Sequence, residues 1–166
     1  LPEGSRIRET GGYKGRGTEL PRAELYEALT ETVGVQEGRI VNEYGMTELL
    51  SQCYEPVLSR DEEGTLPFGG VPDGPDGLEG RVLSSPPWVN TLVLDPLTLK
   101  PQAHGQVGVL AHLDLANLGS VAAILTEDLG VLASGGFRLL GRSPGSEPRG
   151  CSLAMEDFLA SRGGAS

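Results

Sequence analysis

Short apolar segments and one amphipathic segment alternate along the N-terminal part of the chain. Residues 5–10 predict a short strand, because one apolar residue stands among charged neighbours. A helix is predicted over residues 21–33, since it starts with a proline, which fits the first helical position, and is followed by Gly34, which fits the end. Residues 40–41 predict the buried end of a second strand, and residues 47–52 a short helix leading away from it.

From Trp88 onward the pattern becomes that of a β protein. Short apolar segments recur at regular spacing between turn residues, over residues 88–94, 106–113, 121–125 and 136–140. They predict a small, strongly twisted sheet or barrel packed on the first part. Polar segments 114–120 and 126–130 are expected to connect these strands. His104 and His112 have no second imidazole at ligand spacing, so both are expected to be structural or exposed.

The chain therefore divides into four predicted regions. They are an α/β part over 1–58, an acidic loop rich in glycine and proline over 59–87, a β-rich subdomain over 88–142, and a hinge with a C-terminal tail over 143–166. Within the tail, residues 153–159 predict a short helix. The predicted fold class is α/β, with a partial sheet and helices followed by a small β-barrel-like subdomain.

Composition narrows the classes of function. Among 166 residues, Lys and Arg number 13 against 23 Asp and Glu, a formal net charge of -10, which argues against a general nucleic-acid or membrane-surface binder. No apolar run has the length of a membrane span, and the start lacks the features of a signal peptide. Two cysteines in unlike contexts form neither a disulfide framework nor a metal set, so the cytoplasm is the expected location.

The richest candidate chemistry lies in residues 41–48, with the sequence VNEYGMTE. These residues follow a predicted strand, and open α/β sheets bind ligands at the carboxyl ends of their strands. Gly45 permits a tight turn, and Tyr44 offers a flat face for stacking. The Thr47 hydroxyl can bond a phosphate oxygen, and the Glu48 carboxylate can hold Mg²⁺. The pattern predicts a corner that binds ATP or AMP; by composition alone, a strand–turn–helix junction with Thr47 as N-cap fits equally well.

A second candidate is the glycine-rich basic segment 11–17, which contains Lys14 and Arg16. Backbone amides in such loops can surround an anion. The segment is not a Walker loop, because the Lys-Ser/Thr ending and the following helix are absent. Taken alone, it is an ordinary flexible loop more often than a phosphate site.

The order of these motifs resembles the C-terminal half of LuxE-type acyl-protein synthetases, which belong to the adenylate-forming, acyl-CoA synthetase-like superfamily. Six segments match in the same order: 9–16, 41–52, 86–88, 114–120, 126–130, and 136–142 with 149–153. The resemblance implies the C-terminal part of an adenylate-forming enzyme's large domain, with 1–58 as the nucleotide-binding part of its α/β subdomain.

The resemblance also implies roles for individual residues. Residues 44–48 look like the superfamily's adenylate motif, in which Tyr44 lies against adenine and Gly45 and Met46 also bind the nucleotide. Thr47, on the α-phosphate, and Glu48, on Mg²⁺, would be catalytic. In the other segments, Gly11 and Gly12 look like the glycine loop beside adenine, Asp128 would hold the ribose hydroxyls, and Arg142 would assist near the hinge.

Cys151 is the implied acyl acceptor. Bioluminescence acyl-protein synthetases use a cysteine near the C-terminus that takes the acyl group from the adenylate, and Arg149-Gly150-Cys151-Ser152 looks like that site. Arg149 would favour the thiolate. A small buried apolar cysteine is the alternative for Cys151, and Cys53 is expected to be packing.

The implied activity is ATP-dependent activation of a fatty acid, or another carboxylate, as an acyl-AMP, followed by transfer to a thiol. An acyl-donor or acyl-acceptor protein is the implied partner. The alternatives are a ligase of the phenylacetate-CoA type, which would not need Cys151, a non-catalytic nucleotide-binding remnant, and a purely structural domain.

The sequence departs from the superfamily pattern in two ways that affect the implied activity. The first phosphate loop would lie upstream of Leu1, and the large C-terminal domain with its catalytic lysine is missing. Short LuxE-type enzymes share the second absence. The first, with a chain that opens on Leu1 rather than Met, predicts a fragment, a subunit that needs a partner, or a decayed relative.

Overall fold

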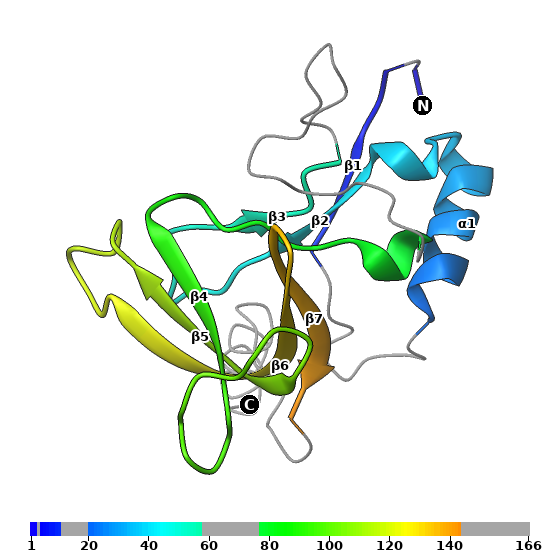
Figure 1. The fold of residues 1–166 in the computed structure, drawn as a ribbon. Helices are drawn as coiled ribbons and strands as arrows, with labels where there is room; N and C mark the ends of the chain where they lie inside the picture. Colours follow the sequence, from blue (N-terminus) through cyan, green and yellow to red (C-terminus); the bar gives the residue numbers. More distant parts are fainter. Residues whose placement is uncertain (3, 11–19, 58–76, 144–166) are drawn as a thin grey trace, which may run out of the picture.

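A computed structural model of the protein describes residues 1–2, 4–10, 20–57 and 77–143. Within these ranges the chain forms a three-stranded sheet with one α-helix beside it, and a four-stranded sheet (Figure 1). The glycine-rich segment 11–17, most of the predicted acidic loop and the tail with Cys151 lie outside the described residues.

The first unit is a strand–helix–strand arrangement. Strand β1 (Ile7–Glu9) pairs in parallel with β2 (Ile40–Tyr44), and helix α1 (Arg22–Val33) connects them. The helix ends at Gly34, whose φ of 73° lies in the left-handed region and whose N–H donates to the Thr30 carbonyl oxygen at 3.0 Å. The strand predicted within residues 5–10 and the helix predicted over residues 21–33 are both confirmed.

Across the described residues, helices are too short or too polar to cross a membrane.

The apolar side of α1 packs onto this sheet. Tyr26 of the helix, Val35 and Ile40 are buried together, and apolar residues of β1 and α1 surround them. A 3-10 helix (Glu37–Arg39) leads into β2, which extends through Tyr44. The polar residues Asn42 and Glu43 therefore belong to the strand, whereas the sequence pattern placed them beyond its end.

Residues 47–52 do not form the predicted helix. Thr47 and Glu48 form a turn, and the chain then enters β3 (Cys53–Tyr54), which pairs antiparallel with β2. Side chains at and after the end of β5 instead bind backbone N–H and C=O groups that would have paired with one another in a helix.

The four-stranded sheet is an antiparallel meander. Its strands are β4 (Val89–Leu94), β5 (Val107–Asp114), β6 (Ala123–Ala133) and β7 (Gly136–Arg142), in that order across the sheet. The four predicted strands are confirmed, but β6 is longer than predicted and includes residues 126–130, which were expected to form a loop. The sheet is open, with β4 and β7 at its edges, so the predicted barrel does not close.

Residues 83–84 join the two sheets. Leu83 bridges Phe137 of β7, and Ser84 bridges Tyr54 of β3. Gly136 fits beside this bridge because a Cβ there would stand 2.1 Å from the Leu83 carbonyl oxygen. A short 3-10 helix (Gly77–Gly80) precedes this segment, and Arg81, Val82 and Leu83 are buried. The described end of the predicted acidic loop is thus packed.

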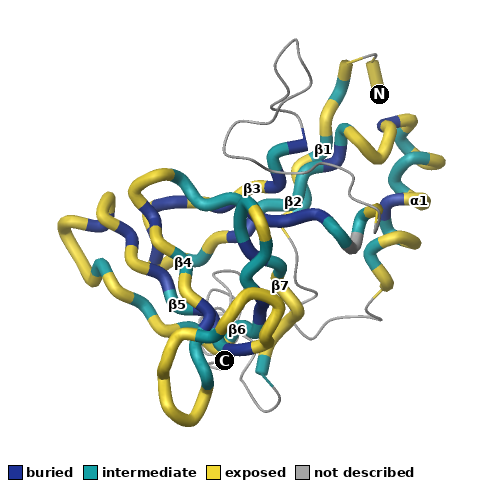
Figure 2. Tube along the Cα trace, in the orientation of Figure 1, coloured by how far each residue is buried: buried dark blue, intermediate teal, exposed yellow. Residues whose placement is uncertain are grey.

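A shared core holds both sheets together. Its buried residues come from β2, β3, the 83–84 bridge and the meander: Tyr44, Cys53, Leu83, Val93, Leu110 and Phe137. Figure 2 shows buried residues gathered where these strands face one another. The end of β2, which carries the predicted adenylate motif, is therefore fixed against the inner face of the meander.

Candidate functional site

Three predicted ligand residues that are far apart in the sequence come together. The Tyr44 hydroxyl at the end of β2 donates to Asp128 Oδ2 at 2.8 Å, although 84 positions separate the two residues. Arg142 Nε lies 3.4 Å from Asp128 Oδ1, and Arg142 Nη2 lies 3.0 Å from Glu127 Oε2. Asp128 and Arg142 are cross-strand partners in β6 and β7. The result is one carboxylate held by a phenol and a guanidinium.

Asp128 stands in an irregular part of β6. The pairing of β6 shifts register against β5 between Val109 and Ala111, and against β7 between Leu129 and Gly130. The Asp128 N–H donates to Thr126 Oγ1 at 3.0 Å. Bulges re-aim side chains at the rim of a sheet, and the Asp128 side chain keeps 18% of its surface exposed. Part of the Asp128 side chain therefore reaches solvent while a strand fixes its backbone.

Tyr44 is 6% exposed, and its ring packs inside the core. The ring centroids of His112 and Phe137 lie 5.4 and 5.6 Å from that of Tyr44. Burial, followed by the charge of Asp128, raises the pKa of Tyr44 far above its usual value, so the phenol keeps its proton. Protein atoms cover the ring in this structure, and stacking of Tyr44 on adenine stays a prediction.

The predicted phosphate and metal ligands lie on the loop that follows β2. Gly45, Thr47 and Glu48 are exposed, and Met46 is half-buried against the shared core. Leu49 N–H donates to the Met46 carbonyl oxygen at 3.1 Å, which closes the turn. The loop thus presents a hydroxyl and a carboxylate to solvent directly after the buried Tyr44.

This loop is anchored by Asp114, the last residue of β5, and by Asn117 in the segment that follows. Buried Asp114 accepts hydrogen bonds from Ser51 N and Ser51 Oγ, both at 3.0 Å. Asn117 Nδ2 donates to the Glu48 carbonyl oxygen at 2.8 Å. These contacts account for the missing helix, because side chains of the meander hold the backbone groups of the loop. From the sequence, Asp114 and Asn117 were expected in a connecting segment, and their anchoring of the loop was not predicted. The signal that could have indicated it is a pair of polar residues directly after an apolar strand.

His112 was expected to be structural or exposed, and the structure shows it buried. It is 2% exposed on β5, and burial lowers the pKa of His112 to about 4, against a smaller opposing effect of the Asp114 charge. The imidazole is therefore neutral at pH 7.

Acid should destabilise the fold through His112. Because the folded-state pKa is below the ordinary value of 6.5, the unfolded chain binds the proton first, and stability is lost as the pH falls from 6.5 towards 4. The loss attributable to this side chain should reach about 3 kcal/mol. Urea denaturation at pH 7.5 and pH 4.5 measures it, with His112→Gln as the control that cannot titrate. Equal pH dependence in both proteins would show that His112 does not carry the effect.

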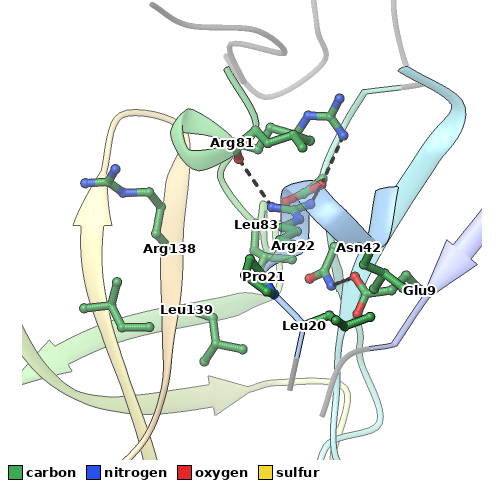
Figure 3. A pocket seen from close by; sticks show the side chains of 13 residues that line it. Glu9, Leu20, Pro21, Arg22, Asn42, Arg81, Leu83, Arg138 and Leu139 are labelled. Atoms are coloured by element: carbon green, nitrogen blue, oxygen red, sulfur yellow. Dashed lines mark hydrogen bonds and ion pairs between the residues drawn. The ribbon is translucent and has the colours of Figure 1, made fainter. Parts of the chain in front are cut away.

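A separate cavity of about 600 Å³ lies between the start of α1 and β7 (Figure 3). Its charged residues pair within the protein: Arg22 Nη2 lies 2.5 Å from Glu55 Oε2, and Arg81 Nη1 lies 3.7 Å from the same oxygen. Asn42 Nδ2 donates to Glu9 Oε2 across β1 and β2. Among the residues that the structure describes, none of the predicted ligand residues lines this cavity. In the described ranges no cluster of three or more His, Cys, Asp or Glu residues could hold a metal ion by itself.

Comparison with known proteins places the chain in a family. A family model described as "Acyl-protein synthetase, LuxE" matches residues 72–160, more than half of the chain. The chain belongs to the LuxE acyl-protein synthetase family. This confirms the resemblance seen in the sequence, and the match includes Asp128, Arg142 and Cys151.

Two curated relatives carry the same name. The long-chain-fatty-acid–luciferin-component ligase of Aliivibrio fischeri is 45% identical over 124 residues, and that of Vibrio harveyi is 28% identical over 123 residues. Each alignment covers 74% of this chain and 27% of the relative. The chain therefore spans about a quarter of the length of these LuxE-family relatives.

The fold has relatives among solved structures. The crystal structure of apo MatB from Rhodopseudomonas palustris matches with a TM-score of 0.50 and 17% identity, over 84% of this chain and 26% of that one. The predicted α/β fold class is confirmed, and the chain shares its fold with part of this structure. The roles of individual residues stay predictions, and Gly11, Gly12 and Cys151 lie outside the described residues.

Proposed function

We propose that the protein containing this chain activates a fatty acid as an acyl-AMP and passes the acyl group to a thiol. The chain would supply the ribose-facing and phosphate-facing part of the nucleotide site. The observation that supports this most is the contact of Tyr44, Asp128 and Arg142, three residues singled out by family motifs and joined here at one carboxylate. The names of the two long-chain-fatty-acid ligases that the chain resembles support a fatty acid as the substrate.

The ribose would bind at Asp128. A carboxylate has lone pairs for two hydroxyl donors, and here Tyr44 and Arg142 each hold one oxygen while part of the side chain stays exposed. The 2′ and 3′ hydroxyls of AMP would donate to these oxygens. Gly11 and Gly12, which come soon after β1 in the sequence, would line the adenine together with Tyr44.

The phosphate would lie at the loop after β2. Thr47 offers a hydroxyl to the α-phosphate, and the exposed Glu48 carboxylate suits Mg²⁺, which proteins usually hold through one or two carboxylates together with substrate phosphates. A single exposed carboxylate therefore fits this ion better than a complete protein cage would. When bound, Mg²⁺ would neutralise phosphate charge.

The thiol step would use Cys151. Its thiolate attacks the acyl carbonyl carbon of the mixed anhydride, a carbon–sulfur bond forms, the carbon–oxygen bond to the phosphate breaks, and AMP leaves with the electron pair. An external protein thiol or coenzyme A in the same position would give the alternative acceptors.

Asp128→Asn tests the nucleotide site. The expected result is a loss of AMP affinity of about 10-fold, because one carboxylate oxygen that accepts from a ribose hydroxyl becomes an amide donor. Titration calorimetry with AMP measures it, and Asp95→Asn, in an exposed turn after β4, is the matched control. Binding of AMP without fatty-acid-dependent exchange of pyrophosphate into ATP would favour a nucleotide-binding remnant. No binding by the natural full-length protein would contradict the proposal.

A further inference from the structure

A continuous series of side-chain hydrogen bonds runs from the proposed ribose carboxylate into the core. After the 2.8 Å contact of Asp128 with Tyr44, the Tyr44 hydroxyl lies 3.3 Å from His112 Nε2. His112 Nδ1 lies 3.0 Å from Thr91 Oγ1 on the neighbouring strand β4. Thr91 Oγ1 lies 2.8 Å from Ser85 Oγ, which lies 3.5 Å from Cys53 Sγ. Six residues, from five strands and from the segment that precedes β4, form this series of hydrogen bonds, the polar chain.

The carboxylate sets the direction of the first hydrogen bonds. An ionised Asp128 can only accept, so Tyr44 uses its single hydroxyl hydrogen on Asp128 Oδ2. The Tyr44 oxygen can then only accept from His112 Nε2, which makes that nitrogen a donor. A neutral imidazole has one N–H, so His112 Nδ1 is an acceptor.

The remaining groups follow in the same direction. Thr91 donates to His112 Nδ1, Ser85 donates to Thr91, and Cys53 donates to Ser85. Burial raises the pKa of the Cys53 thiol, although its contact with Ser85 opposes the shift, so the sulfur keeps the hydrogen that this direction requires. Each of the five neutral groups thus donates one hydrogen bond towards Asp128. All of them except Cys53, the last group, also accept one from the next group.

We propose that His112 is a positioning residue for the ribose site. Its Nε2–H occupies the acceptor side of the Tyr44 hydroxyl and so keeps the hydroxyl hydrogen directed at Asp128 Oδ2, while Arg142 fixes the opposite oxygen. The carboxylate is then oriented before a nucleotide arrives, which lowers the cost of binding. The inference rests on the proposed role of Asp128.

His112 is well placed for this function. The imidazole is buried between Tyr44 and Phe137, whose ring centroid lies 5.8 Å away, so it does not contact the nucleotide. Thr91, on the adjacent strand, holds the orientation of the imidazole ring through its contact with Nδ1. The residue acts on the ligand only through Tyr44 and Asp128.

The test compares His112→Leu with His112→Gln in the natural full-length protein, using AMP and 2′,3′-dideoxy-AMP as probes in titration calorimetry. Leucine removes the donor to Tyr44, whereas glutamine carries an amide N–H at about the same reach. We expect His112→Leu to weaken AMP binding about 10-fold and leave dideoxy-AMP binding unchanged, and His112→Gln to restore the preference for AMP. Val93→Ala, which removes fully buried methyl groups from the same core, controls for loss of stability.

The outcomes separate the two proposals. If the wild-type protein binds AMP no better than dideoxy-AMP, Asp128 does not hold the ribose, and both proposals fall. If the wild-type protein prefers AMP but His112→Leu weakens both ligands equally, as Val93→Ala would, His112 is structural and only the present inference falls. Loss of the preference in His112→Leu together with its return in His112→Gln supports it.

Discussion

Replacing Cys151 by serine should abolish transfer of the acyl group to the protein while leaving fatty-acid-dependent adenylation in place. A thiolate attacks the acyl carbonyl, and a serine hydroxyl without an adjacent base is a far weaker nucleophile at neutral pH. The expected loss of covalent labelling is on the order of 10³-fold. Labelled fatty acid measures the acyl-protein in the natural full-length enzyme, and exchange of pyrophosphate into ATP measures the adenylation step.

Ser152→Ala is the control for this experiment, because it changes the adjacent position and keeps the thiol. Full labelling of Cys151→Ser would show that the acyl acceptor lies elsewhere. If labelling is absent from both proteins but coenzyme A releases AMP in each, the enzyme is a coenzyme A ligase of the alternative kind, and Cys151 is not needed.

Replacing Asp114 by asparagine should lower the free energy of unfolding by about 3 kcal/mol. Asp114 is fully buried and accepts from Ser51 N, Ser51 Oγ and Ala116 N, so its carboxylate holds the loop after β2 against the end of β5. In asparagine one oxygen becomes an NH₂ group, which places a donor against a donor. Urea denaturation followed by circular dichroism measures the change.

Asp95→Asn gives the matched comparison. Asp95 also accepts from backbone N–H groups, those of Leu97 and Thr98, but in an exposed turn where water can replace the lost acceptor. We expect it to unfold nearly as the wild type does. Equal and small effects of both substitutions would show that the contacts of Asp114 do not stabilise the loop.

The regular elements could be predicted because their signals are local. The proline and glycine at the ends of α1, and the apolar segments of β4, β5 and β7, are present in the sequence itself. The helix predicted at 47–52 does not form, because Asp114 and Asn117 bind backbone groups that the helix would have paired internally. Both residues are distant in sequence and close in space, so no local pattern indicates these contacts. Strand β6 was predicted too short, since residues 126–130 have few of the apolar positions that mark a strand.

The sequence could indicate which residues belong to the candidate site, but not how they are arranged in space. Family motifs singled out Tyr44, Asp128 and Arg142, yet no local pattern indicates that a tyrosine will bond a carboxylate 84 positions away. His112 was missed because a lone histidine on an apolar strand looks like core. Its function depends on which atoms face its two nitrogens, and only the packed structure shows that.

The meander also bears on how the protein folds. Strands β4 to β7 pair with their neighbours in sequence, so each hairpin closes a short loop, and the contact order of that sheet is low. The end of β2 joins the same core only across a much longer separation. We therefore expect the meander to form early and β2 to pack against it afterwards. The loop after β2 should then be among the last parts of the described chain to become native.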